Sequence, residues 1–268
     1  MSLIDAIILG LVEGITEFLP VSSTGHLILT RDWRGLHGDY VDRLLIIIQG
    51  AAILAVCWEF RKKLLHTAFS LHNDAVSRRF VLNLLIAFLP LAILGLLFGD
   101  QLKALFFNPV SVAIALVVGG VIILWAERRK HEERVTDVDQ LGTTDALKLG
   151  LFQALALIPG TSRSGATIIG GLLCGLSRKT AAEFSFFVAI PVLLAATALD
   201  LWKARHELAT VDLTPLIVSC VVSFASALAV TKLLLRYVSR HSFAWFAWYR
   251  IAFGALILIA WKAGWVSW

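Results

Sequence analysis

The chain has 268 residues, of which 58% are hydrophobic and only 16% are charged, and its mean hydropathy is +0.81. A soluble domain carries about 25% charged residues, so this composition excludes an ordinary soluble enzyme and indicates an integral membrane protein. The formal net charge of +5 indicates orientation in a membrane and argues against binding of nucleic acid, because so little of the chain faces water.

The segment 3–29 begins the chain with two short apolar arms around a polar centre, EGITEFLPVSSTGH, at residues 13–26. A helix needs roughly 20 residues to cross the ~30 Å hydrocarbon core, and neither arm reaches that length. Non-helical backbone at membrane depth is tolerated only where it is buried in protein or lines a cavity. We therefore expect a re-entrant helical hairpin with a polar tip.

Two carboxylates of this centre, Glu13 and Glu17, are four residues apart and project from one face of a helical arm. Adjacent carboxylates repel each other in a low dielectric unless a cation lies between them. A hard divalent cation, Mg²⁺ or Ca²⁺, takes oxygen ligands of this kind. We expect a metal site at Glu13 and Glu17, the alternative being a pair that faces a wet vestibule without function.

Three hydroxyl side chains, Ser22, Ser23 and Thr24, follow at the end of this centre. If a helix restarts there, its free N–H groups and these hydroxyls form an anion cradle, although serine and threonine also cap helices. His26 is suited to proton transfer near neutral pH. It can be the nucleophile, the general base for Ser23 or for a water, or a structural histidine, and we favour a chemical role.

Six apolar runs are close to the length of a membrane-spanning helix. Three lie between the first polar segment and a second one at 146–176, and three follow the second. The runs are Leu44–Phe60, Phe80–Phe98, Val110–Ala126, Phe184–Leu201, Leu213–Leu235 and Phe243–Trp261. We therefore expect an all-α polytopic membrane protein.

The second polar segment, 146–176, has a centre at residues 159–167 with the sequence PGTSRSGAT. Arg163 is its cation, and a guanidinium matches phosphate oxygens in a bidentate manner. The structural alternative for Arg163 is a salt bridge to Glu13 or Glu17, which would itself bring the two centres together. The other side chains expected to bind phosphate here are Ser162, Ser164 and Thr167.

The two polar segments are related by an offset of 140 residues, at which Asp5 pairs with Asp145 and Ser22 with Ser162. Three spans separate the copies, and an odd number inverts the second copy, a layout typical of transporters with a site near the midplane. We expect one membrane domain over 1–268, with repeat 1 at about 1–134 and repeat 2 at about 141–268. Each repeat should hold one re-entrant hairpin and three transmembrane helices.

Basic residues gather in two loops, 60–79 and 127–145, which include Lys63 and Lys130. Loops rich in lysine and arginine stay in the cytoplasm. The first hairpin should therefore enter the membrane from outside and the second from the cytoplasm, so that their tips meet.

Two motifs of the polar centres match those of a known family. An ExxxE motif runs from Glu13 to Glu17 and is followed by Ser-Ser-Thr-Gly-His from Ser22 to His26; a PGxSRSxxT motif runs over 159–167. At these residues the chain resembles the undecaprenyl-pyrophosphate phosphatase family of bacteria, which is also linked to bacitracin resistance. The resemblance runs over nearly the full chain.

This resemblance implies hydrolysis of undecaprenyl pyrophosphate to the monophosphate and inorganic phosphate, which recycles the lipid carrier for peptidoglycan and other cell-envelope polymers. It implies dependence on a divalent cation, a multi-pass protein of the bacterial inner membrane and a site that opens to the periplasm. The expected partners are the polyprenyl pyrophosphate lipid and the bilayer, with a homodimer left open. The expected catalytic residues are Glu17, Ser23, His26 and Arg163.

Our hypothesis for the chemistry is that Ser23 or a water attacks the terminal phosphorus while His26 handles the proton. The competing interpretation is a transporter or flippase for a phosphorylated lipid that uses the same site.

Overall fold

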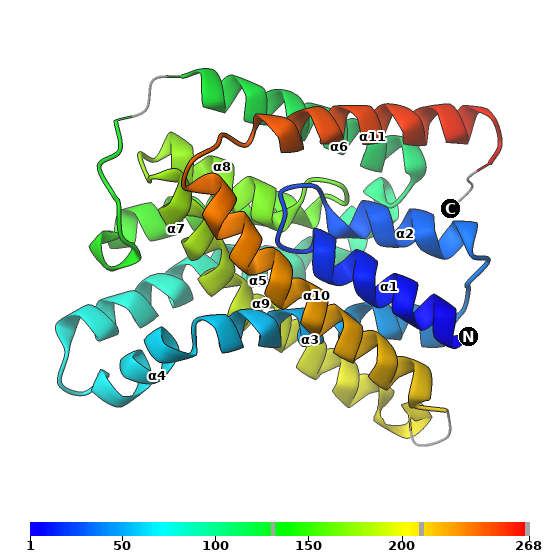
Figure 1. Cartoon of the computed structure of the whole chain (residues 1–268), viewed down its shortest axis with the longest axis horizontal. Coiled ribbons are helices and arrows are strands. Elements are labelled where there is room, and N and C mark those ends of the chain that lie inside the picture. Colours follow the sequence, from blue (N-terminus) through cyan, green and yellow to red (C-terminus); the bar gives the residue numbers. More distant parts are fainter. Residues whose placement is uncertain (130–131, 209–211, 266–268) are drawn as a thin grey trace.

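The computed structural model describes residues 1–129, 132–208 and 212–265, and this part of the chain is helical apart from one isolated β-bridge (Figure 1). Six of its helices are long and apolar enough to cross a membrane, and each overlaps one of the six apolar runs. They are α3 (Asp39–Glu59), α5 (Ala75–Phe106), α6 (Pro109–Arg128), α9 (Arg178–Leu208), α10 (Thr214–Val238) and α11 (Ala244–Lys262). The all-α class and the six candidate spans are thereby confirmed, while Lys130 lies outside the described residues.

Each polar segment forms two short helices with a break between them. The first consists of α1 (Leu3–Thr16) and α2 (Ser23–Trp33), and the second of α7 (Thr143–Ala154) and α8 (Arg163–Leu173). Both α2 and α8 begin directly after a serine with left-handed backbone, because Ser22 has φ 71° and Ser162 has φ 72°. Among the described residues, these two serines alone adopt positive φ without being glycine. We call α1–α2 the first hairpin and α7–α8 the second hairpin.

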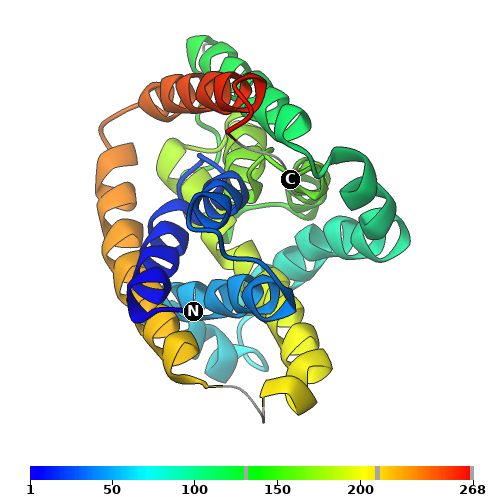
Figure 2. The ribbon, with the colours of Figure 1, turned by 90° about the vertical axis from the view of Figure 1, so that its right-hand side faces the viewer.

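Each hairpin packs against a spanning helix of the other half of the chain. Helix α1 lies along α10, and α7 lies along α5. The contact is made at equivalent glycines, since a Cβ on Gly10 would lie 2.5 Å from the Ser219 carbonyl and one on Gly150 would lie 2.6 Å from the Ala87 carbonyl. Helices α6 and α11 lie side by side across one end of the molecule (Figures 1 and 2). The two halves are thus interlocked around the hairpins.

An acidic residue near the start of each hairpin pairs with an arginine. In the first hairpin Arg34 contacts Asp5 at 2.7 Å, and in the second Arg134 contacts Asp145 at 2.6 Å. Arg134 precedes the second hairpin, and its backbone N–H donates to the Gly175 carbonyl at 2.9 Å. Val135 continues this contact through the isolated bridge to Leu176. We call residues 134–135 the strap.

The loop expected at 60–79 contains a short helix, α4 (Arg61–Ser70). Lys63 of α4 forms an ion pair with Asp139, and its ammonium lies 5.0 Å from the ring centre of Phe80. The long basic side chains of α4 keep their charges in water while their alkyl stems cover apolar surface. A segment that composition alone marks as a loop is therefore helical.

Candidate active site

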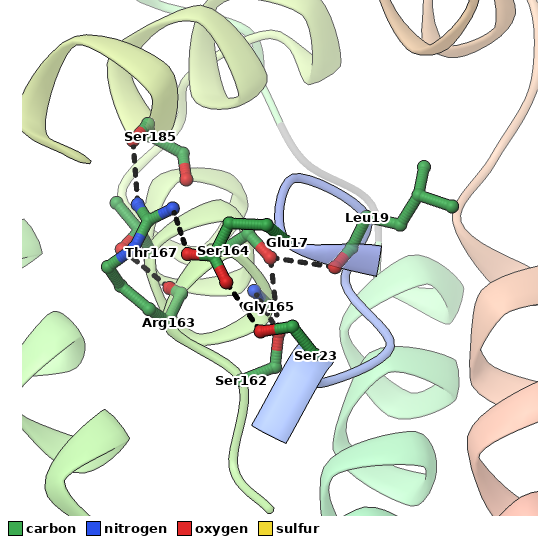
Figure 3. A network of polar contacts seen from close by, with 9 residues as sticks. All are labelled: Glu17, Leu19, Ser23, Ser162, Arg163, Ser164, Gly165, Thr167 and Ser185. Atoms are coloured by element: carbon green, nitrogen blue, oxygen red, sulfur yellow. Dashed lines mark hydrogen bonds and ion pairs between the residues drawn. The ribbon is translucent and has the colours of Figure 1, made fainter. Parts of the chain in front are cut away.

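The tips of the two hairpins contact each other through polar side chains (Figure 3). Glu17 follows the last turn of α1, and Arg163 begins α8. Arg163 Nη2 lies 3.3 Å from Glu17 Oε1, and both side chains are less than a tenth exposed. The second contact is Ser164 Oγ, which donates to the Leu19 carbonyl at 2.8 Å. The salt bridge considered for Arg163 is therefore present with Glu17, and it joins the two polar centres.

Glu17 also accepts a hydrogen bond from Ser23 Oγ through its second oxygen. One carboxylate thus holds a hydroxyl of the first hairpin and the guanidinium of the second. The second terminal nitrogen of the guanidinium, Arg163 Nη1, donates to the Ser185 carbonyl at 3.1 Å. Arg163 Nε is buried and has no hydrogen-bond partner among the described residues. The arginine therefore keeps one donor without a protein partner in the described part of the chain.

A cavity of about 170 Å³ lies at this meeting point, and we call it the catalytic cavity. Its lining includes six of the site residues predicted from the sequence: Glu17, Ser22, Ser23, Thr24, Ser162 and Arg163. Two predicted phosphate-binding residues lie elsewhere. Ser164 bonds the other hairpin, as described above, and Thr167 Oγ1 donates to the Arg163 carbonyl at 2.9 Å. Both stabilise the tips instead of lining the cavity.

Glu13 lies one helical turn before Glu17 and is fully buried. Neither of its carboxylate oxygens has a hydrogen-bond partner among the described residues. A buried carboxylate without a partner is costly, and a divalent cation relieves that cost. Glu13 and Glu17 form only a pair, since the described residues contain no group of three acidic, histidine or cysteine side chains able to hold a metal. The pair nevertheless fits Mg²⁺, which is commonly held by one or two carboxylates together with substrate phosphates and water.

His26 does not reach the Glu17–Ser23–Arg163 network in this structure. Its Nδ1 lies 2.8 Å from the Ser22 carbonyl, which can only accept, so this nitrogen carries the hydrogen. Its Nε2 lies 2.6 Å from the Tyr249 hydroxyl. The ring also stacks on Phe253, with 4.1 Å between centres. His26 thus ties the start of α2 to α11, and its chemical role stays a prediction.

Sequence reasoning placed neither Tyr249 nor Arg250 of α11 at the site. Arg250 is 1% exposed and holds both tips against α6. The available signal was an arginine inside the apolar run Phe243–Trp261, because a charge at membrane depth indicates function. The Arg250 guanidinium donates, over 3.0–3.3 Å, to the carbonyls of Pro20, Ala115, Leu116, Gly160 and Thr161.

Comparison with known proteins decides the family. The family described as "Bacitracin resistance protein BacA" matches residues 6–256. The chain belongs to the BacA family. The resemblance inferred from the ExxxE and PGxSRSxxT motifs is thereby confirmed.

Several relatives in this family match almost the whole chain. A protein of Dechloromonas aromatica (strain RCB) named "Undecaprenyl-diphosphatase" is 56% identical over 266 residues, which cover 99% of this chain and 97% of the relative. "Undecaprenyl-diphosphatase 2" of Rhodospirillum rubrum is 58% identical over 272 residues, with the same shares covered. "Undecaprenyl-diphosphatase" of Pseudomonas putida (strain W619) is 54% identical over 264 residues, which cover 98% of this chain and 96% of the relative.

Proposed function

We propose that this BacA-family chain is an undecaprenyl-diphosphatase, a bacterial membrane hydrolase that converts undecaprenyl pyrophosphate to undecaprenyl phosphate and inorganic phosphate. This reaction recycles the lipid carrier of cell-wall synthesis and underlies bacitracin resistance. The observation that carries the proposal is the network in which Glu17 holds both Ser23 and Arg163 inside the catalytic cavity. It places an acceptor, a hydroxyl and a guanidinium at one point, as phosphoryl transfer requires.

Arg163 binds the terminal phosphate in this proposal. Its buried Nε lacks a partner and can donate to a phosphate oxygen while Nη1 stays on the Ser185 carbonyl. The N–H groups at the start of α2 and α8, together with the Ser22 hydroxyl, add donors from both hairpins. Charge on the phosphoryl oxygens is therefore stabilised from two sides of the cavity.

Ser23 is the nucleophile in this proposal, and Glu17 accepts its proton. The Ser23 oxygen bonds to the terminal phosphorus, the bridging P–O bond breaks, and its electron pair stays on the departing lipid monophosphate. Water then attacks the phosphoserine, the Oγ–P bond breaks, and Glu17 returns the proton to Ser23. We assign the proton to Glu17 instead of His26, because Ser23 Oγ donates to Glu17 whereas both His26 nitrogens are engaged elsewhere.

Glu13 and Glu17 would hold the divalent cation, Mg²⁺ or Ca²⁺. When bound, the cation supplies positive charge that neutralises the developing charge on the phosphates. The orphaned oxygens of Glu13 support this assignment. Glu17 would then serve the cation, Ser23 and Arg163 together, which makes its position the centre of the site.

The site also implies an arrangement in the membrane. We propose that both hairpins are re-entrant and that the two halves form an inverted repeat. The equivalent breaks at Ser22 and Ser162 and the reciprocal packing of α1 on α10 and α7 on α5 support this layout. The basic loops then face the cytoplasm, and the catalytic cavity opens towards the periplasm. A homodimer stays a prediction that the mass of the detergent-solubilised protein would test.

Phosphate release from undecaprenyl pyrophosphate by the purified chain in detergent tests the proposal. We expect release that depends on Mg²⁺ or Ca²⁺ and falls by at least about 10²-fold in Glu17→Gln, Ser23→Ala and Arg163→Ala, since each removes a group that stabilises or generates transition-state charge. Glu59→Gln is the matched control, because Glu59 pairs with Lys232 at 3.5 Å outside the cavity. Its activity should equal that of the wild type.

Three further results distinguish the alternatives. Acid-quenched wild-type reactions should contain phosphoserine at position 23, and its absence together with an active Ser23→Ala variant would make water the nucleophile. If folded wild-type protein releases no phosphate under any cation, the transporter interpretation takes first place. Normal kcat in His26→Ala at every pH would leave His26 a structural role.

A further inference from the structure

A second cavity, of about 630 Å³, adjoins the catalytic cavity, and we call it the lipid-side cavity. It lies between α2, α3 and the end of α5. Thr24 and Gln49 line both cavities, so the two spaces meet at these side chains. A volume of 630 Å³ is within the range of about 300–1,000 Å³ typical of ligand sites, whereas 170 Å³ is below it. The catalytic cavity is therefore large enough for a head group only.

The two cavities differ in chemistry as well as in size. The catalytic cavity contains Glu17, Ser23 and Arg163, whereas much of the lipid-side wall is aliphatic. Charged groups return at its far end, where Arg31 pairs with Asp42 and Lys103 joins the rim. The aliphatic side chains of this wall include Leu27, Ile28, Leu45 and Ile46. A polar pocket that continues into an apolar one matches a molecule with a phosphate head and a hydrocarbon tail.

Gln49 is the polar group at the junction. It belongs to α3, its side chain is half-buried, and its amide has no hydrogen-bond partner among the described residues. Thr24 is exposed in the first turn of α2, where backbone N–H groups are also free. A neutral amide and a hydroxyl can donate to phosphate oxygens without changing their own protonation. They can therefore bind a phosphate that is retained and does not react.

We propose that the lipid-side cavity binds the tail-bearing half of the substrate, with Gln49 and Thr24 on the phosphate that stays attached to the lipid and the aliphatic wall on the first isoprenoid units. This proposal rests on the proposed function and assigns its second phosphate. Arg163 and Ser23 hold the phosphate that is transferred. Gln49 holds the leaving phosphate as the bridging P–O bond breaks, and it donates a hydrogen bond without losing its proton.

The two products of the reaction can be used to test the two subsites separately, because each product carries a different one of the two phosphates. Undecaprenyl monophosphate keeps the phosphate assigned to Gln49, and inorganic phosphate keeps the one assigned to Arg163. For Gln49→Ala we expect the inhibition constant of undecaprenyl monophosphate to rise about tenfold, the loss of roughly one hydrogen bond to a charged group. The constant for inorganic phosphate should stay within about twofold of the wild type.

Two other variants complete the test. Gln101→Ala is the matched control, since Gln101 is an exposed glutamine of α5 that lines neither cavity. Ile46→Trp fills the aliphatic wall and should raise KM for undecaprenyl pyrophosphate while inorganic phosphate still inhibits. It tests the cavity independently if Gln49→Ala does not fold. Equal effects of Gln49→Ala on both products, or none on the lipid product, would overturn the assignment of Gln49.

Binding measured by calorimetry keeps this proposal separate from the proposed function. Undecaprenyl monophosphate should bind the wild type without turnover, and it should bind Gln49→Ala and Ile46→Trp about tenfold more weakly. If the chain does not hydrolyse undecaprenyl pyrophosphate but both variants bind the monophosphate more weakly, the assignment of the subsite holds and the proposed function is wrong. If hydrolysis is normal but both variants bind the monophosphate as the wild type does, the subsite fails.

Discussion

The first and second hairpins share a backbone design but carry different chemistry. Both pack through equivalent glycines, both break at a serine with positive φ, and both begin with an aspartate paired to an arginine. Many side chains at the tips differ between the two hairpins, and four of the matched pairs include a residue predicted to take part in the chemistry. Glu13, Glu17, Ser23 and His26 of the first hairpin correspond to Gln153, Leu157, Arg163 and Ala166 of the second.

This difference shows how a duplicated frame supports one site. The first hairpin supplies the carboxylates and the hydroxyl, and the second supplies the cation. Two acidic tips would repel each other in a low dielectric, whereas an acidic tip and a basic tip attract across a short distance. The Glu17–Arg163 contact therefore both joins the hairpins and assembles the site.

The largest effects are expected at the repeat pair Glu13 and Gln153, both of which are fully buried. The test replaces each residue by the type found at the other position. Glu13→Gln should lower activity by at least about 10²-fold and abolish stimulation by the divalent cation, while thermal stability holds or rises. Gln153→Glu places an unpaired carboxylate in the second hairpin and should cost about 3 kcal/mol or more. Thermal unfolding in detergent and cation titrations measure both. Stability losses of equal size would contradict the assignment of Glu13 to a cation.

An intermediate effect is expected for Arg250→Lys, which tests whether the two tips must be held together. An ammonium keeps the charge but cannot reach the five carbonyls that the guanidinium binds. We expect kcat to fall about 10- to 100-fold with little change in KM. In an Arg163→Ala background, the same change should have no further effect, because the tips no longer share a catalytic contact. Additive losses in the double variant would assign Arg250 to stability alone.

The smallest effect distinguishes the two serines with positive φ. Ser162 Oγ accepts from the Gly165 N–H at 3.1 Å and so caps α8, whereas Ser22 makes no side-chain cap bond to α2. Ser162→Ala should therefore cost about 1 kcal/mol of stability, and Ser22→Ala close to none. Replacement of either serine by glycine removes the steric cost of the positive φ, and so serves as the control for backbone strain in the alanine variants. Equal melting shifts in the two alanine variants would show that the hairpin ends are stabilised in the same way.

The sequence predicted the frame well, because hydrophobic run lengths and a fixed offset determine which segments span and which break. It also predicted that the two tips would meet, and it offered a salt bridge from Arg163 to Glu13 or Glu17 as the structural alternative to phosphate binding; the structure has the contact with Glu17. The contacts of α11 could not be predicted from the sequence. Tyr249 lies 223 residues from His26. Arg250 donates to five backbone carbonyls, which carry no sequence signature. Which of the predicted hydroxyl side chains line the cavity, and which bond within the tips, depends on side-chain rotamers that the spacing of residues does not determine.

The strap affects where this polypeptide can be divided. Arg134 and Val135 precede the second repeat, yet they bind Gly175 and Leu176, and Arg134 neutralises Asp145. A break placed just before residue 134 would give a second fragment that carries its own counterion and its own backbone tether. A break after residue 140 would leave that fragment with a bare aspartate. The linker between the halves is thus an integral part of the second one, and fragment complementation should respect that boundary.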